Sequence, residues 1–219
     1  MENFKFYSQV GQDKYVYETF FKNRKEPGSF LDIGAHDGIS KSNSYFFEKH
    51  LNWKGICVEP IPQIFAELQK NRQCICINGG VSDRNGKATF WSIEGYSEML
   101  SGIAENYNDA HKNRIEKELK EHGGKLNEIE IDIFDINTIL SQNNLSEVQY
   151  CTIDVEGSEE KILSVLDNKQ FDIEVFTIEN NYQAQSMRKL MKSKGYKLHS
   201  KIEFDDVYTK TKKWFFFNL

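Results

Sequence analysis

Acidic side chains end several apolar runs of the sequence, and they are the groups best placed to do chemistry. The runs end at Asp32, Glu59, Asp154 and Glu179. In the stretch TIDVEG, Glu156 follows Asp154 by two residues, so both carboxylates point to the same side of an extended strand. Two carboxylates that close repel each other unless a proton or a cation lies between them. This acidic edge suits a ligand that carries positive charge.

The stretch FLDIGAHDGIS, residues 30–40, predicts a strand that runs into a ligand-binding turn. Gly34 and Gly38 permit the turn and let the backbone approach a nucleotide-like ligand. A dinucleotide fold uses GxGxxG to hold a pyrophosphate, whereas here His36 and Asp37 occupy the turn and Asp37 would oppose an anion. S-adenosylmethionine has no phosphate but has a sulfonium, an ammonium, a carboxylate and a ribose diol. Spacing and charge therefore favour S-adenosylmethionine as the cofactor.

Two other functions stay open at this point. One is an NAD-dependent oxidoreductase or epimerase, which the missing GxGxxG and the absence of Tyr-x-x-x-Lys after a strand disfavour. Glu59 does not discriminate, because an acid that binds ribose hydroxyls occurs in nicotinamide folds as well. The other is a non-catalytic module that keeps the cofactor fold without turnover.

Alternating periodicities predict an open α/β fold. Strands are predicted at 29–34, 54–59, 74–82, 86–93, 148–157 and 171–180, and helices at 8–21, around 45–51, at 60–71, 104–122 and 158–167. Alternation around Ile129–Ile133 predicts a half-exposed edge strand, and the tail predicts an antiparallel hairpin of 196–204 with 212–218. Strands separated by helices give a parallel sheet, and ligands bind at its carboxyl edge. We expect one domain, 1–219, with a lid or insertion around 95–125.

Five motifs in order resemble one known family. SQVGQD, FLDIGAHDG, WKGICVEP, GGVSDRNG and TIDVEGSEEKIL follow the pattern of FkbM-type methyltransferases, which depend on S-adenosylmethionine. The resemblance implies a Rossmann-like class I methyltransferase with a mostly parallel seven-stranded sheet, helices on both faces and a C-terminal antiparallel hairpin. It also implies methylation of a hydroxyl oxygen, often on a sugar or a glycosylated product.

The resemblance assigns cofactor-binding positions residue by residue. They are Asp32, Gly34, Ala35, His36, Gly38, Glu59, Pro60, Ser82, Asp83 and Asp154. Glu59 falls at the ribose, and Ser82 and Asp83 fall in the loop that passes the adenine. His36 departs from the pattern, because many methyltransferases have a third glycine there, so its imidazole has no role carried over. Helix capping is the alternative role for Asp32 and Glu59.

Methyl transfer to a hydroxyl calls for positioning and for a base, because the hydroxyl must lose its proton. We expect Asp154 to be the base, with Glu156 and Glu179 orienting the acceptor or sharing the proton, and His36 as the rival base. A divalent cation bridging Asp154 and Glu156 is an alternative way to acidify the hydroxyl, and an ion pair with Lys161 is the structural alternative for Glu156. Candidate acceptor contacts are Gln12, Tyr96, Ser97, Glu98 and Ser101.

Composition restricts the partners. The 219 residues carry a net charge of −5 without a basic stripe, which disfavours nucleic acid. No apolar run approaches the length of a membrane span and MENFKFYSQ lacks a signal-peptide core, so we expect a cytoplasmic protein. The four cysteines have no CxxC spacing and are expected as free thiols. The expected partner is a sugar or glycan acceptor, and a domain of this size is compatible with a larger glycan-synthesising polypeptide or complex.

Overall fold

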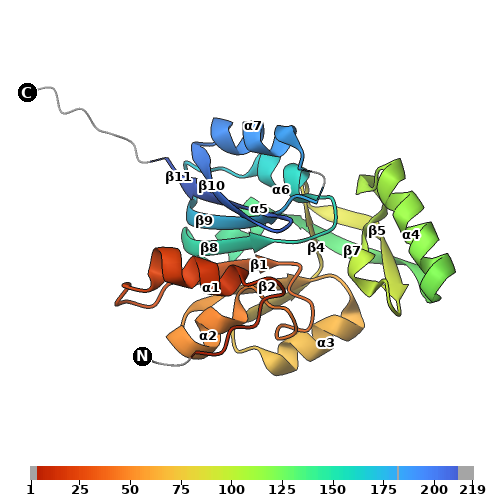
Figure 1. The fold of residues 1–219 in the computed structure, drawn as a ribbon, viewed down its shortest axis with the longest axis horizontal. Helices are drawn as coiled ribbons and strands as arrows, with labels where there is room; N and C mark the ends of the chain where they lie inside the picture. The colour runs from red at the N-terminus through yellow and green to blue at the C-terminus, as the bar shows by residue number, and fades with distance from the viewer. Residues whose placement is uncertain (1–3, 182, 212–219) are drawn as a thin grey trace, which may run out of the picture.

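The computed structural model describes residues 4–181 and 183–211, and a seven-stranded sheet is its centre (Figure 1). The strands lie in the order β10-β11-β9-β8-β1-β2-β3. Their bounds are β1 Ser29–Ile33, β2 Lys54–Glu59, β3 Ile75–Asn78, β8 Glu147–Ile153, β9 Asp172–Glu179, β10 Tyr196–Ile202 and β11 Asp205–Lys210. All pairings from β3 through β9 are parallel, while β11 runs antiparallel to β9 and β10. The predicted fold class is confirmed.

Helices cover both faces of this sheet because its central strands are apolar on both sides. One face packs against α1 (Gln12–Val16), the π-helix η1 (Tyr17–Phe21), α2 (Tyr45–Leu51) and α3 (Pro62–Asn71), with Val16, Phe46 and Leu68 fully buried. The other face packs against α5 (Ile136–Gln142), α6 (Glu159–Val165) and α7 (Gln185–Ser193). Among the described residues, no helix has both the length and the apolar character needed to span a bilayer.

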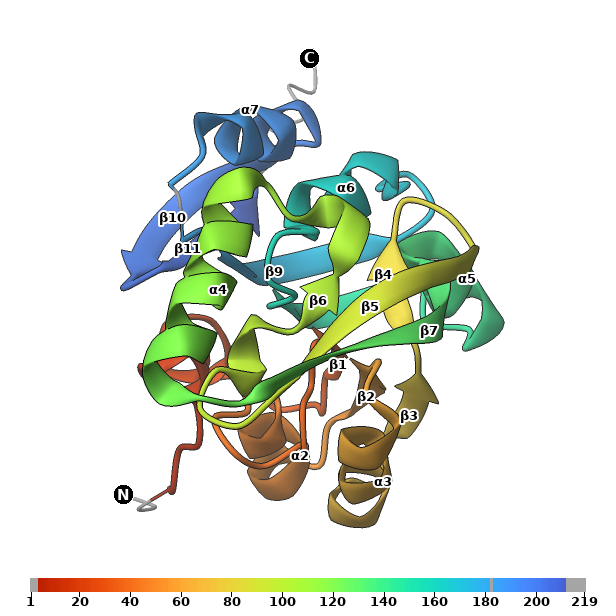
Figure 2. The ribbon, with the colours of Figure 1, turned by 90° about the vertical axis from the view of Figure 1, so that its right-hand side faces the viewer.

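A second sheet is inserted between β3 and α5. It consists of β4 (Gly80–Ser82), β5 (Gly86–Glu94), β6 (Gly102–Ile103) and β7 (Lys125–Asp135), in the order β4-β7-β5-β6. Between β5 and β7 the chain forms the 3-10 turns η2 (Glu98–Leu100) and η3 (Ala104–Asn106) and the helix α4 (Asp109–His122). We call residues 95–124 the lid. Figure 2 shows the small sheet and α4 in front of the seven-stranded sheet.

Several predicted elements differ from the structure. The first helix begins at Gln12 instead of Ser8. The run 74–82 is two strands in two sheets rather than one. The strand around Ile129–Ile133 is not an edge strand, because β7 pairs with β5 on one side and with β4 over Ile133–Asp135 on the other. Its alternation reflects a sheet with one solvated face.

The C-terminal hairpin has a different second strand from the predicted one. β10 pairs with Asp205–Lys210, the segment DDVYTK, which the prediction treated as a polar turn. Asp205 and Asp206 are buried there, so acidic residues misled the pattern. The predicted strand 212–218 lies outside the described residues. The helix α7 was not predicted, although Met187 and Met191 recur at helical spacing and are buried.

Candidate active site

The turn after β1 is held between the ends of two neighbouring strands. The amides of Gly34 and Ala35 both donate to the Val58 carbonyl of β2 at 3.0 Å, and the Asp154 amide donates to the Ile33 carbonyl at 3.0 Å. Gly34 has φ 90°, and a Cβ there would lie 1.9 Å from the Asp154 carbonyl oxygen. Only glycine fits this position, and the approach brings the Asp154 backbone against the turn.

A cavity that is open to solvent runs along this turn, and its empty space, part of which is open solvent, measures about 710 Å³. Apolar side chains line one part of it, among them Ile61, Ile64, Val81 and Phe90. Its ionisable lining consists of the carboxyl groups of Glu59, Glu98 and Asp154 and the imidazole of His36, and no described lining residue is Lys or Arg. Such a cavity accepts a flat apolar ring and a cation, and it opposes a pyrophosphate.

A smaller recess of about 430 Å³ adjoins this cavity and shares Gly34, His36 and Asp154 with it. Asp32 and Lys41 both line the recess together with Asp154, so it offers acidic and basic side chains, as an amino-acid zwitterion requires. Gln12 and Ala35 line it as well. The cavity and the recess together therefore fit a ligand with an apolar ring at one end and an amino acid at the other.

Glu59, the last residue of β2, is 5% exposed and faces the cavity. Its Oε2 accepts from the His36 amide at 3.0 Å and its Oε1 from the Ile61 amide at 2.8 Å. Burial raises its pKa to about 7 although these two hydrogen bonds favour the ionised form. Each carboxylate oxygen keeps a second lone pair, so Glu59 can still accept from ribose hydroxyls. Pro60, the next residue, also lines the cavity.

Asp32 is buried at 4% exposure beneath the turn. Its Oδ2 accepts from the Ser44 hydroxyl at 2.5 Å, and that hydroxyl also accepts from Arg72 Nη2 at 3.0 Å. Burial raises the pKa of Asp32 against the opposing effects of Arg72 and Ser44. Arg72 also donates to the Gly38 carbonyl at 3.1 Å, so one guanidinium supports both Asp32 and the end of the turn.

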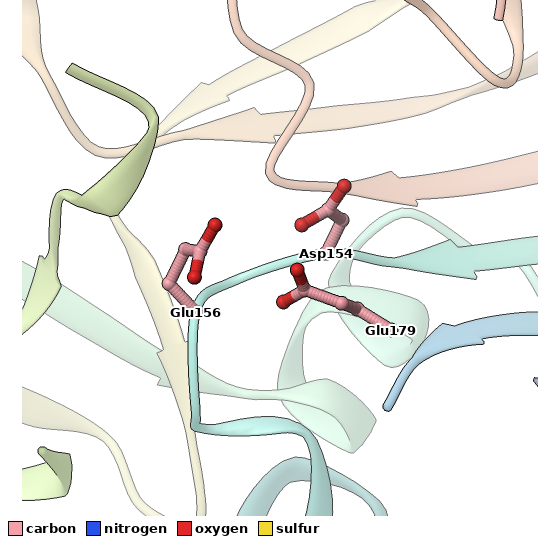
Figure 3. A group of neighbouring side chains, drawn as sticks. All are labelled: Asp154, Glu156 and Glu179. Atoms are coloured by element: carbon pink, nitrogen blue, oxygen red, sulfur yellow. The ribbon is translucent and has the colours of Figure 1, made fainter. Parts of the chain in front are cut away.

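Asp154, Glu156 and Glu179 converge at the carboxyl ends of β8 and β9 (Figure 3). One carboxylate oxygen from each lies within 4.8 Å of the others. Burial is the largest cause of the raised pKa of all three groups, and repulsion by nearby carboxylates adds to it: Asp205 and Glu159 act on Asp154, and Asp154 acts on Glu156 and Glu179. A hydrogen bond between Asp154 and Glu179 opposes the rise for Asp154. We call Asp154, Glu156 and Glu179 the acid cluster.

The acid cluster lies between the cofactor-sized cavity and a second, polar cavity. Asp154 lines the first, whereas Glu156 and Glu179 line the second, which measures about 910 Å³. Amide and aromatic side chains form much of the second lining: Asn106, Tyr107, Asn108, His111, Asn180 and Asn181. A ligand in either cavity therefore meets the same carboxyl groups.

The lid is bound to the start of α6 beside this cluster. Asn106 Nδ2 donates to the Ser158 hydroxyl at 2.5 Å, and Lys161 Nζ donates to Asn106 Oδ1. Lys161 is thus bound to Asn106, and it forms no ion pair with Glu156 among the described residues. Tyr107 and His111 stack with ring centroids 4.4 Å apart and planes 8° from parallel, as part of the second cavity's wall.

Other predicted site residues lie apart from the acid cluster. His36 Nε2 is 3.4 Å from Glu98 Oε1 of the lid, and its φ of 51° is in the left-handed region. Glu98 and Ser101 line the cofactor-sized cavity rather than the second one. Tyr96 is 74% exposed and its ring lies tilted against that of His122, while Ser97 is buried.

The adenine-loop assignment of Ser82 and Asp83 differs from the geometry. The cavity is lined by Gly79, Gly80 and Val81, one step earlier in the chain. Ser82 instead donates to Asp83 Oδ1 at 3.2 Å and is paired with Asp135 of β7. The sequence pattern also did not predict that Asn106 and Asn108 line the second cavity. Asn180 and Asn181 had one signal, which is their position directly after Glu179.

The sequence and the fold of this chain are similar to those of known proteins. The profile of the FkbM methyltransferase domain matches residues 32–198. Among solved structures, a methyltransferase FkbM from Methylobacillus flagellatus KT has 12% identity and a TM-score of 0.49, covering 90% of this chain and 50% of that one. A precorrin-6y C5,15-methyltransferase from Geobacter metallireducens GS-15 has 10% identity and a TM-score of 0.47, covering 90% of this chain and 87% of that one.

A protein of the NADB-Rossmann superfamily from Streptococcus agalactiae has 11% identity and a TM-score of 0.42, covering 93% of this chain and 69% of that one. This chain spans about half the length of the Methylobacillus protein. A search of curated protein sequences finds no match. The domain profile covers most of the chain, and this protein therefore belongs to the FkbM methyltransferase family.

Proposed function

We propose that this protein transfers the methyl group of S-adenosylmethionine to a hydroxyl oxygen, and that the acceptor is a sugar or a glycan. One observation carries the proposal. The acid cluster lies between a cavity without lysine or arginine, suited to a sulfonium nucleoside, and a polar cavity suited to an acceptor.

The residues fit the cofactor in each of its parts. Glu59 would accept from the ribose hydroxyls, the apolar wall with Ile61 and Phe90 would hold the adenine, and Asp32 and Lys41 would face the amino-acid end. When bound, the cofactor supplies a methyl group that a positive sulfur has already activated. The acidic lining supports a sulfonium over NAD, whose pyrophosphate would meet carboxylates in the same space.

The lining of the second cavity supports a polyhydroxylated acceptor. Asn106, Asn108, Asn180 and Asn181 offer amide donors and acceptors, which match sugar hydroxyls in both directions. The stacked rings of Tyr107 and His111 form part of the wall beside these amides.

In this proposal Asp154 takes the acceptor's proton. Its raised pKa, about 7, suits a group that must accept a proton near neutral pH, because a base works best when its pKa is close to the working pH. Glu156 and Glu179 orient the hydroxyl from the acceptor side. The chemistry needs little else from the chain, because correct orientation of two reactants can supply roughly 7–11 kcal/mol of a barrier.

Calorimetric titration with S-adenosylhomocysteine, S-adenosylmethionine and NAD tests the cofactor. We expect micromolar binding of the first two and none of NAD, with at least a tenfold loss in Glu59→Ala. Glu67→Ala is the matched control, since Glu67 lies on the exposed face of α3 and pairs only with Lys70. Binding of NAD alone would favour the oxidoreductase, and binding of none of the three would favour the non-catalytic module.

A screen of glycans with methyl-labelled S-adenosylmethionine tests the acceptor. We expect label in an ether linkage on a sugar, and its loss in Asp154→Asn. Free thiols at all four cysteines suit the cytoplasmic location that we propose along with this activity.

A further inference from the structure

The acid cluster is built by backbone features that force three carboxylates together. Asp154 follows β8 directly, and its amide is bound to β1. Glu156 has φ 55°, a left-handed conformation that is costly for a residue with a side chain. Glu159 fixes this bend, because its carboxylate accepts from the amides of Val155 and Gly157 at 3.1–3.2 Å. The strained backbone thus turns the Glu156 carboxylate toward Asp154 and Glu179.

Basic side chains do not neutralise this cluster within residues 4–181 and 183–211. None of the ion pairs there includes Asp154, Glu156 or Glu179. Lys161 is bound to Asn106, and Arg114 pairs with Glu118 and lowers the pKa of Glu156. Three carboxyl groups without a paired counter-charge repel one another when they are ionised, so they hold either protons or a cation.

A fourth acid provides an independent sign of a ligand. Asp205 of β11 lies directly opposite Glu179 of β9 in the register, so the two side chains share one side of the sheet. It is 3% exposed, and its Oδ2 accepts from Gln12 Nε2 at 2.8 Å while its buried Oδ1 has no partner among the described residues. Its charge raises the pKa of both Asp154 and Glu179, so it faces the cluster. A buried carboxylate oxygen without a donor is costly unless a cation or a water supplies the missing interaction.

We propose that Asp154, Glu156 and Glu179 bind a divalent cation, and that Asp205 accepts a hydrogen bond from a water on that ion. All the ligands are carboxylate oxygens, which suit Mg²⁺, Ca²⁺ or Mn²⁺ rather than the metals that prefer histidine or cysteine. Opposite oxygens around Ca²⁺ lie about 5 Å apart and around Mg²⁺ about 4.2 Å apart. The three oxygens lie within 4.8 Å of one another, inside the distance between opposite oxygens around Ca²⁺, and a small closure would suit Mg²⁺.

The cation would take part in the proposed methyl transfer, so its role rests on that proposed function. An ion held by these three carboxylates would make a hydroxyl bound to it more acidic, and Asp154 would take the proton of that hydroxyl. The acceptor oxygen then forms its bond to the methyl carbon as the carbon–sulfur bond breaks, and the electron pair of that bond goes to sulfur. The products are a methyl ether and S-adenosylhomocysteine.

Titration with Mn²⁺ of the purified protein without cofactor, followed by the electron paramagnetic resonance signal of free Mn²⁺, tests the site. We expect one ion per chain, competed by Mg²⁺ and Ca²⁺. Glu156→Gln and Glu179→Gln should each weaken binding at least tenfold. Glu174→Gln is the matched control, because Glu174 lies on the same strand β9, half exposed, and pairs with Arg24.

S-adenosylhomocysteine calorimetry on every variant separates the two proposals and reports on folding. Wild-type protein that binds S-adenosylhomocysteine but no Mn²⁺ would overturn the cation site and leave the methyltransferase proposal standing. Mn²⁺ binding without S-adenosylhomocysteine binding would do the reverse. Equal Mn²⁺ affinity in wild type, Glu156→Gln and Glu179→Gln would place the ion elsewhere and overturn the site. If a variant fails to bind S-adenosylhomocysteine, the double variant Glu156→Asp, Glu179→Asp replaces it, since this change keeps the charges and shortens the reach.

Discussion

Glu59 shows how one buried side chain can combine a structural and a binding role. Its two oxygens hold the amides of His36 and Ile61, so it fixes both the turn after β1 and the start of α3. It also lines the cofactor-sized cavity. The sequence left capping and ribose binding as alternatives for this residue, and the geometry allows both at once, because a carboxylate has about four lone-pair positions.

Cofactor affinity should depend on pH through Glu59. Its pKa is raised from the ordinary 4.5 to about 7, so near pH 6 the Glu59 carboxyl group is mostly protonated. The ribose hydroxyls of the cofactor must then displace this proton. We expect S-adenosylhomocysteine to bind up to about tenfold more tightly at pH 8 than at pH 6, as the ionised fraction of Glu59 grows. Calorimetry across this range on wild type and Glu59→Gln checks it, and an equally steep dependence in Glu59→Gln would assign the effect to another group.

The same shift has a consequence for stability with a definite sign. Between about pH 4.5 and 7 the folded state binds the Glu59 proton more tightly than the unfolded chain does. The contribution of Glu59 to the free energy of unfolding therefore falls as pH rises through this window. Bound S-adenosylhomocysteine should reduce that fall, because it favours the ionised carboxylate in the folded state.

At the scale of elements, the site exists because β1 and β8 end against each other. β8 is the direct neighbour of β1 although about 115 residues separate them in the chain, and Asp154 follows its last residue. The contact between the Gly34 backbone and the Asp154 carbonyl sets how near the turn and the acid cluster can come. Cofactor and acceptor chemistry are thus joined at one strand pair.

Gly34→Ala should therefore destabilise the fold strongly. The new methyl would lie 1.9 Å from a backbone oxygen at φ 90°, so two strands must move apart. We expect a loss of about 3 kcal/mol or more in the free energy of unfolding measured with urea.

Gly195→Ala is the matched control for this prediction. Gly195 has φ 84°, but nothing lies within 4 Å of an added Cβ, so only the backbone strain of about 1–2 kcal/mol applies. Equal losses in the two variants would show that conformation alone, and not the contact with Asp154, sets the cost.

At the scale of the whole molecule, the lid is an insertion between β5 and β7, which pair with each other. Glu94 of β5 and Lys125 of β7 are the last partners of an antiparallel ladder, and a Cβ on Gly95 would lie 3.3 Å from the Gly124 Cα. Removing residues 96–123 would leave the connection Glu94-Gly95-Gly124-Lys125. Two glycines between paired strands suit a two-residue hairpin loop.

We expect this deletion variant to fold and to lose cofactor affinity. The seven-stranded sheet and both its helical layers remain. The deletion, however, removes Glu98, Met99, Ser101 and Ile103 from the cavity wall. Cooperative thermal unfolding with at least tenfold weaker S-adenosylhomocysteine binding would agree with this view. Undiminished binding would show that the lid does not complete the cavity, and loss of cooperative unfolding would show that the large sheet needs it.

The sequence by itself determined the elements and the acids at their ends. Apolar runs that end in Asp32, Glu59, Asp154 and Glu179 predicted buried parallel strands and the carboxyl edge of their sheet. They could do so because strands covered on both faces must be apolar until they reach solvent. Local patterns also placed Gly34 in its turn. They failed where burial depends on distant partners, as at Asp205 and Asp206, whose acidic character concealed a central strand.

Only the tertiary structure decided which of these groups meet. Strand order brings Glu179 beside Asp154 and pairs Asp205 with Glu179, and the path of the insertion puts Asn106 of the lid next to Ser158. The sequence predicted Ser101 and Glu98 as acceptor contacts, whereas in the structure both line the cofactor-sized cavity. Sequence spacing cannot carry this information, because contacts between residues far apart in the chain follow from sheet order and the path of the insertion, and neither leaves a local pattern.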